Sequence, residues 1–173
     1  VERYHQAYPG VRQNFHKLIQ TMLTNGRMIT NLLGRRIKLL EEWGDKLFKV
    51  GYSCIPQSSV GDIINERGVN YLYYNPQWFT PVELLKQTHD SVNFQIPLSQ
   101  PWSYHAEVLL KLKASLEQPL HWEDRTFVIP TDFTIGLNMR KEVGVELKAK
   151  NWPKNEHQLA YKLWEAYCHL RCK

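Results

Sequence analysis

The chain has 173 residues, of which 43% are apolar and 23% are charged. This balance is typical of one folded domain and excludes an intrinsically disordered chain. No apolar run approaches the roughly 20 residues that a membrane helix needs, so we expect a soluble protein with no membrane partner. The formal net charge of +5 favours polyanionic partners such as nucleic acid.

The three cysteines, Cys54, Cys168 and Cys172, do not have the spacing of a disulfide framework, and their odd number argues against a secreted disulfide scaffold. A reducing cytoplasm is the expected location. The pair Cys168 and Cys172 lies four residues apart, but no second pair has ligand spacing, so we interpret the thiols as ordinary. The first residue is Val1 and the helical pattern begins without a capping residue, which indicates a piece of a longer polypeptide.

The first half of the chain predicts a helix, a hairpin and a second helix. Apolar residues recur at helical spacing over 11–23, after a break at Pro9-Gly10. Turn signals around Gly34 then predict an irregular hairpin over 27–40, with its arginines pointing outward. We expect the next helix over about 56–73, with Pro56 in its first turn and a buried stripe behind it.

The second half predicts a strand pair followed by alternating helix and strand. The strands 82–87 and 91–96 enclose His89-Asp90 at a hairpin tip. A surface helix covering a sheet should follow Pro101. The region 125–139 has extended character. The last helix should bury one apolar stripe, formed by Leu159, Leu163, Trp164, Tyr167 and Leu170. This order predicts an α+β fold with an antiparallel sheet, as one segment over 1–173.

Three groups of residues suit binding or catalysis, and each also has a simpler structural interpretation. Arg35 and Arg36 beside Gly34 suit phosphate contacts, or form a solvated basic turn. Gln57, on the opening turn of its helix, can donate to the minor-groove acceptors that all base pairs share, or is simply exposed. His89-Asp90 places a carboxylate where it could hold a divalent cation, although an Asp at a tight turn is often only turn chemistry.

Together these pieces resemble the C-terminal part of family A DNA polymerases, the group that includes bacterial DNA polymerase I. Four elements match in order and cover essentially the whole chain: "RYHQAYPGVRQNF", "NGRMITNLLGRRIKL", "IPQSSVGDII" and "LLKQTHDSVNFQIP", the last resembling motif C. The resemblance implies a palm fold with a motif C hairpin, and template-dependent transfer of dNMP to a primer 3′ end. The partners it implies are primer-template DNA and deoxynucleoside triphosphates.

The resemblance also implies roles for individual residues. Asp90 matches the aspartate that binds the catalytic Mg²⁺ ions of a two-metal site, and His89 matches the histidine at the primer terminus. Gln57 matches a glutamine that touches the minor groove, and Arg35 and Arg36 match arginines near the DNA backbone.

The chain departs from the family pattern at several positions. Ser91 stands where motif C usually has Glu, and Ser58-Ser59 stand for Gly-Thr. In the family, the positions of Lys49 and Ser53 contact DNA and are commonly Arg and Asn. We therefore expect this chain to make fewer minor-groove contacts.

The second palm aspartate, in motif A, and the nucleotide-gripping fingers helix precede this segment in the family. We therefore expect the chain to be inactive without such an upstream segment. A non-catalytic DNA-binding module that retains the polymerase scaffold is the alternative. A metal-dependent nuclease would need more acidic residues near Asp90. The enzyme could be cellular, or virus-encoded and acting in the host cytoplasm.

Overall fold

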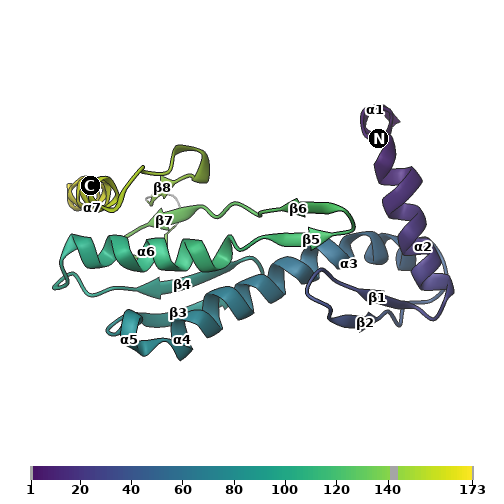
Figure 1. Cartoon of the computed structure of the whole chain (residues 1–173), viewed down its shortest axis with the longest axis horizontal. Coiled ribbons are helices and arrows are strands. Elements are labelled where there is room, and N and C mark those ends of the chain that lie inside the picture. The colour runs from purple at the N-terminus through teal and green to yellow at the C-terminus, as the bar shows by residue number, and fades with distance from the viewer. Residues whose placement is uncertain (1, 141–143, 173) are drawn as a thin grey trace. The chain divides into compact units, whose positions relative to one another are not determined.

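The computed structural model describes residues 2–140 and 144–172 and has the predicted α+β character (Figure 1). The helical segments are α1 (Glu2–Ala7), η1 (Val11–His16), α2 (Lys17–Thr24), α3 (Asp45–Ile63), η2 (Ile64–Val69), α4 (Asn70–Tyr74), α5 (Pro76–Phe79), α6 (Trp102–Leu116), η4 (Ala149–Asn151) and α7 (Glu156–Arg171). The segments η1 and η2 are π-helical, and η4 is a 3₁₀ turn. No helix in the described ranges is long and apolar enough to cross a membrane.

The strands form antiparallel pairs rather than one continuous sheet. The pairs are β1 (Met28–Thr30) with β2 (Arg36–Lys38), β3 (Glu83–Thr88) with β4 (Ser91–Gln95), β5 (Leu120–Trp122) with β6 (Arg125–Phe127), and β7 (Phe133–Ile135) with β8 (Val145–Leu147). The chain divides into two compact units, Val1–Asp62 and Ile63–Lys173.

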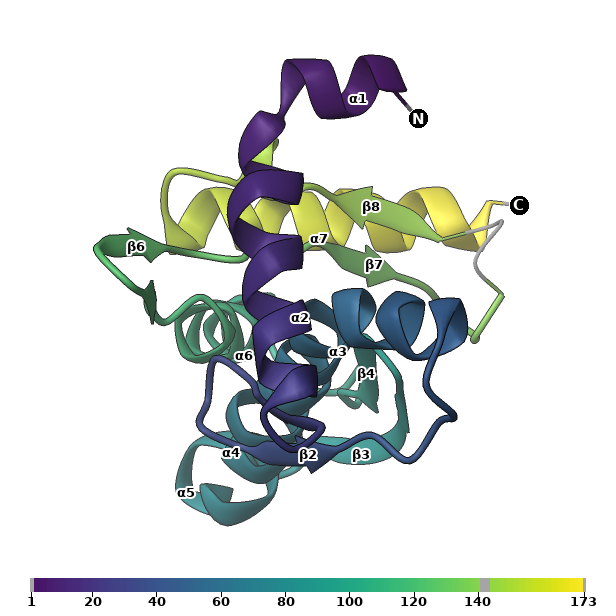
Figure 2. The ribbon, with the colours of Figure 1, turned by 90° about the vertical axis from the view of Figure 1, so that its right-hand side faces the viewer.

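In the first unit, η1 and α2 form the predicted helix over 11–23, and α2 packs on β1. Ile19 and Leu23 of α2 are fully buried with Ile29 of β1, as the helical spacing predicts. Gly51 of α3 faces them closely: a methyl group there would lie 2.9 Å from Ile19 Cγ2. Figure 2 shows α1 running across the end of α2, beyond the Pro9-Gly10 break. The first unit therefore has a core formed by α2, α3 and the first hairpin.

The predicted start of the second helix is wrong, because α3 begins at Asp45 and contains Pro56 in its interior. Proline fixes φ near the helical value, so its main cost inside a helix is one missing hydrogen bond and a clash with the preceding turn. The chain turns at Gly44, which has φ +155° and precedes the first helical residue. Lys49 and Ser53 therefore lie inside the helix and not in a loop before it.

In the second unit, α6 packs chiefly on α7 and η2, so its main neighbours are helices and not the sheet that we expected. The buried residues of α6 include the predicted apolar stripe, which consists of Val108, Leu109, Leu112 and Leu116. In α7, Leu159, Leu163 and Ala166 are buried, whereas Trp164 is exposed. The prediction that Trp164 lies on the buried face is wrong, because the small Ala166 occupies that face instead.

Candidate functional site

The β3–β4 hairpin has the tip that the sequence predicts. The pairing of Thr88 with Ser91 closes the ladder and leaves His89 and Asp90 as a two-residue turn, with both side chains exposed. The hydroxyls of Thr88 and Ser91 contact each other directly below the turn. Ser91 thus has a partner inside the hairpin.

The hairpin is supported from one side by η2. Four successive residues of β4, beginning at Ser91, are half-buried, and β4 packs on η2. At Gly68 of η2 there is room for a methyl group but for little more, because it would already lie at contact distance, 3.7 Å from Val92 Cγ1 and 3.4 Å from Leu116 Cδ2. A larger side chain at this position would push apart β4 and α6. The strand that leads out of the His89-Asp90 tip is therefore packed on η2.

Asp90 supplies one carboxylate, and within the described ranges no three His, Cys, Asp or Glu side chains gather as a metal-binding group. Mg²⁺ prefers six oxygen ligands in octahedral geometry, usually one or two carboxylates together with waters and phosphate oxygens. The tip alone therefore does not fit a Mg²⁺ ion. A site built around Asp90 would need further oxygens from a second carboxylate and from a bound triphosphate.

The predicted DNA-binding residues Lys49, Ser53 and Gln57 lie on one face of α3. They are four residues apart, so at about 100° per residue they span roughly 80° around the helix axis. Lys49 and Gln57 are exposed, and Ser53 is half-buried with its hydroxyl donating to Val50 O at 3.1 Å. The corrected start of α3 is what aligns the three side chains, which we call the α3 stripe.

The basic turn of the first hairpin contacts α3 elsewhere. Ser59 is fully buried, and its Oγ accepts a hydrogen bond from Leu32 N at 3.1 Å. Ser59 follows Gln57 by two residues, which rotates it by about 200° around the helix. The turn that carries Arg35 and Arg36 is therefore anchored on a side of α3 that faces away from Gln57.

The two predicted arginines differ in their contacts. Arg36 opens β2 and is exposed. Arg35 is also exposed, but its Nε donates to Asp62 Oδ2 at 2.8 Å. Gly34 precedes them with φ +86°, a left-handed conformation that suits glycine at this turn. Arg27 does not point outward as expected: its Nη1 donates to Glu41 O at 2.8 Å, and its guanidinium lies over the Trp43 ring.

The cysteines have free thiols, and burial raises the pKa of Cys54 above its ordinary value. A higher pKa lowers the thiolate fraction at neutral pH, so Cys54 is a poor nucleophile.

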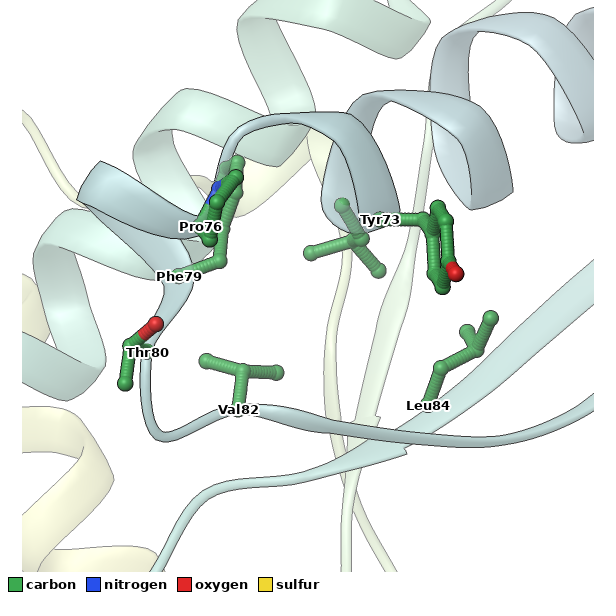
Figure 3. A pocket seen from close by; sticks show the side chains of 7 residues that line it. Tyr73, Pro76, Phe79, Thr80, Val82 and Leu84 are labelled. Atoms are coloured by element: carbon green, nitrogen blue, oxygen red, sulfur yellow. The ribbon is translucent and has the colours of Figure 1, made fainter.

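A small pocket was not predicted from the sequence. It has a volume of about 150 Å³ and lies between α4, α5 and the start of β3, lined by Leu72, Tyr73, Pro76, Phe79, Thr80, Val82 and Leu84 (Figure 3). The aromatic-rich stretch that spans α4 and α5 is the sequence signal that could have indicated it.

Comparison of the chain with protein-family models, with curated proteins and with solved structures found no match. The resemblance to family A polymerases therefore rests on the sequence motifs alone.

Proposed function

We propose that this chain is the distal palm portion of a family A, DNA-directed DNA polymerase, which transfers dNMP from deoxynucleoside triphosphates to a primer 3′ end. The observation that carries the proposal is the exposed His89-Asp90 turn at the end of a hairpin that is seated on η2. The order of the four sequence motifs supports the same assignment.

In this proposal Asp90 supplies one carboxylate of a two-metal Mg²⁺ site. The other palm carboxylate and the fingers residues come from an upstream polymerase segment, because Asp90 alone does not fit the metal. His89, beside it on the turn, contacts the primer terminus. The chain without the upstream segment is inactive, and the complete enzyme acts in the cytoplasm of a cell or of a virus-infected host.

The first unit supplies DNA contacts in this proposal. The exposed amide of Gln57 donates to the purine N3 and pyrimidine O2 acceptors of the minor groove, which are common to all base pairs. Lys49 lies at the other end of the α3 stripe and neutralises a backbone phosphate, while Ser53 offers a hydroxyl between them. Arg35 and Arg36 contact phosphates from the basic turn.

Primer extension tests the proposal. The chain is mixed with a family A polymerase segment that carries motif A and the fingers, together with Mg²⁺, dNTPs and a primer-template. We expect extension that depends on this chain and is lost in Asp90→Asn. Asp124→Asn is the matched control, because Asp124 occupies the second position of the β5–β6 turn. Extension that is absent, or that is equal in the two variants, would contradict the assignment of Asp90.

The alternative function is a non-catalytic DNA-binding module. Ser91 in place of the motif C Glu favours it, because the tip then has one acidic group fewer than the family pattern. This alternative predicts salt-dependent duplex binding that Asp90→Asn leaves unchanged, with no extension in the reconstituted mixture.

A further inference from the structure

A buried asparagine organises the turn between β1 and β2. Asn31 is only 4% exposed, and its Oδ1 accepts hydrogen bonds from Leu33 N at 3.1 Å and Arg35 N at 2.9 Å. Its Nδ2 donates to Asp62 Oδ2 at 2.5 Å. The backbone of the basic turn is therefore tied to a carboxylate in α3 through one amide side chain.

The same carboxylate oxygen also binds the side chain of Arg35. Arg35 Nε donates to Asp62 Oδ2 at 2.8 Å, and the side chains of Arg35 and Asp62 are 54% and 18% exposed. A half-exposed pair of this kind contributes little to stability, because water screens it. Its effect is geometric: one carboxylate fixes both the backbone and the guanidinium of the turn.

The outer edge of the Arg35 guanidinium remains open. Arginine has five N–H donors, and in the part of the chain that the structure describes only Nε has a hydrogen-bonding partner. The space beside the preceding Gly34 is also open, since a methyl group there would meet no atom within 4 Å. An anion can therefore approach the two Nη groups while Nε stays on Asp62.

We infer that Asp62 is a positioning residue that holds Arg35 for a phosphate of bound DNA, an inference that rests on the proposed function. A guanidinium held in this way binds phosphate through two parallel N–H donors. Asp62 then promotes DNA binding although it is negatively charged, because the contact it orients outweighs the repulsion it adds. Arg36, which is exposed, contacts phosphate without this support.

Duplex binding by the full chain tests the inference, with a fluorescent primer-template titrated at several salt concentrations. We expect Arg35→Ala and Asp62→Asn each to weaken binding about ten- to a hundredfold, the range for hydrogen bonds to charged groups. Each variant should lower the slope of log K against log salt by about 0.9, the value for one phosphate. A variant that only reduced the folded fraction would leave the slope unchanged. The double variant should bind no more weakly than Arg35→Ala alone, because both changes remove the same contact.

Glu42→Gln is the matched control, because it removes one negative charge from an exposed residue of the same unit. It should leave binding unchanged or slightly stronger. Thermal melting checks the fold of each variant. If Asp62→Asn does not fold, Arg35→Lys replaces it, since lysine keeps the charge but cannot bind Asp62 and phosphate through one planar group.

The outcomes separate the inference from the proposed function. If the Asp62→Asn variant binds DNA as tightly as the wild type and with the same salt slope, the inference is overturned but the polymerase assignment stands. The same conclusion holds if the Arg35→Lys variant binds DNA as tightly as the wild type. A wild-type chain with no salt-dependent duplex binding would overturn both.

Discussion

Two hairpins in the second unit have the same kind of turn but differ in how their strands pack. Both β3–β4 and β5–β6 end in a two-residue turn with Asp at the second position, His89-Asp90 in one and Glu123-Asp124 in the other. In the first hairpin, β4 is half-buried on η2, whereas every residue of β6 is exposed. An acidic turn is therefore common in itself. What sets the first one apart is the packing of its second strand, β4, on η2.

The turns also differ in backbone conformation. Glu123 has φ +53°, which lies in the left-handed region, whereas neither residue of the His89-Asp90 turn has a positive φ. Left-handed residues are usual in two-residue hairpins that are set by turn chemistry. The β5–β6 turn thus provides a reference for an Asp whose role is only that of a turn residue.

The largest expected effect is on primer extension, when Asp90 is removed from the first turn and a His-Asp turn is built on the β5–β6 hairpin. In the reconstituted extension assay, Asp90→Asn should lower the rate by about a thousandfold, which corresponds to the several kcal/mol of a lost metal ligand. Adding Glu123→His to this variant creates a His-Asp turn on the other hairpin, and it should restore nothing. Recovery of extension would show that the tip sequence suffices without its support.

The next effect concerns the packing beneath β4. Gly68→Val places methyl groups between Val92 and Leu116, and it should lower the free energy of unfolding by about 1–3 kcal/mol, the usual cost of overpacking. Gly68→Ala is the control, because its methyl group meets both neighbours at ordinary contact distance. Urea unfolding measures both variants, and equal stability would argue against a close fit between η2 and β4.

A smaller effect should depend on pH. His105 of α6 is 7% exposed, and among the described residues its buried Nε2 has no hydrogen-bonding partner. Burial lowers the pKa of the imidazole below its ordinary 6.5. Below pH 6.5 the unfolded chain therefore binds more protons than the folded chain, so stability should fall as the pH decreases through this value.

Urea unfolding at pH 7.5 and pH 5.5 measures this effect. The loss of stability on acidification should be smaller in His105→Gln than in the wild type. His121→Gln, at an exposed position of β5, is the control. An unchanged pH dependence in His105→Gln would exclude His105 as the group responsible.

The smallest effect should lie within the two hairpins. Thr88→Val removes the hydroxyl contact with Ser91 and should cost about 0.5–1.5 kcal/mol, the net value of one hydrogen bond. Thr126→Val removes a 2.9 Å contact with His121 Nδ1 on exposed strands, and it should cost less than about 0.5 kcal/mol. Thermal melting compares them, and the reverse order would contradict the difference in support.

Local patterns were enough to predict the α+β class and the His89-Asp90 turn, because strand alternation and turn residues act over a few positions. They failed at Pro56, since a proline in a helix interior is tolerated only when tertiary packing compensates for it. They also failed at Trp164, because periodicity does not reveal whether a small residue such as Ala166 takes the buried place.

The contacts that organise the candidate DNA surface were beyond local patterns. Asp62 lies 31 residues after Asn31 and 27 after Arg35, and no spacing rule joins them. The alignment of Lys49, Ser53 and Gln57 depends on where α3 begins, which the sequence analysis placed too late. The candidate residues were therefore proposed from motifs, whereas the side chains that contact them could not be predicted.

The irregular pairing of β3 has a consequence for how the protein behaves in concentrated solution. A two-stranded sheet has open edges, and Leu84 and Leu85 are exposed on β3, which makes this strand a possible template for aggregation. The register shifts between Leu84 and Lys86, so the bulge interrupts the row of backbone donors and Lys86 adds a charge beside it. This combination disfavours strand addition by a second copy of the chain.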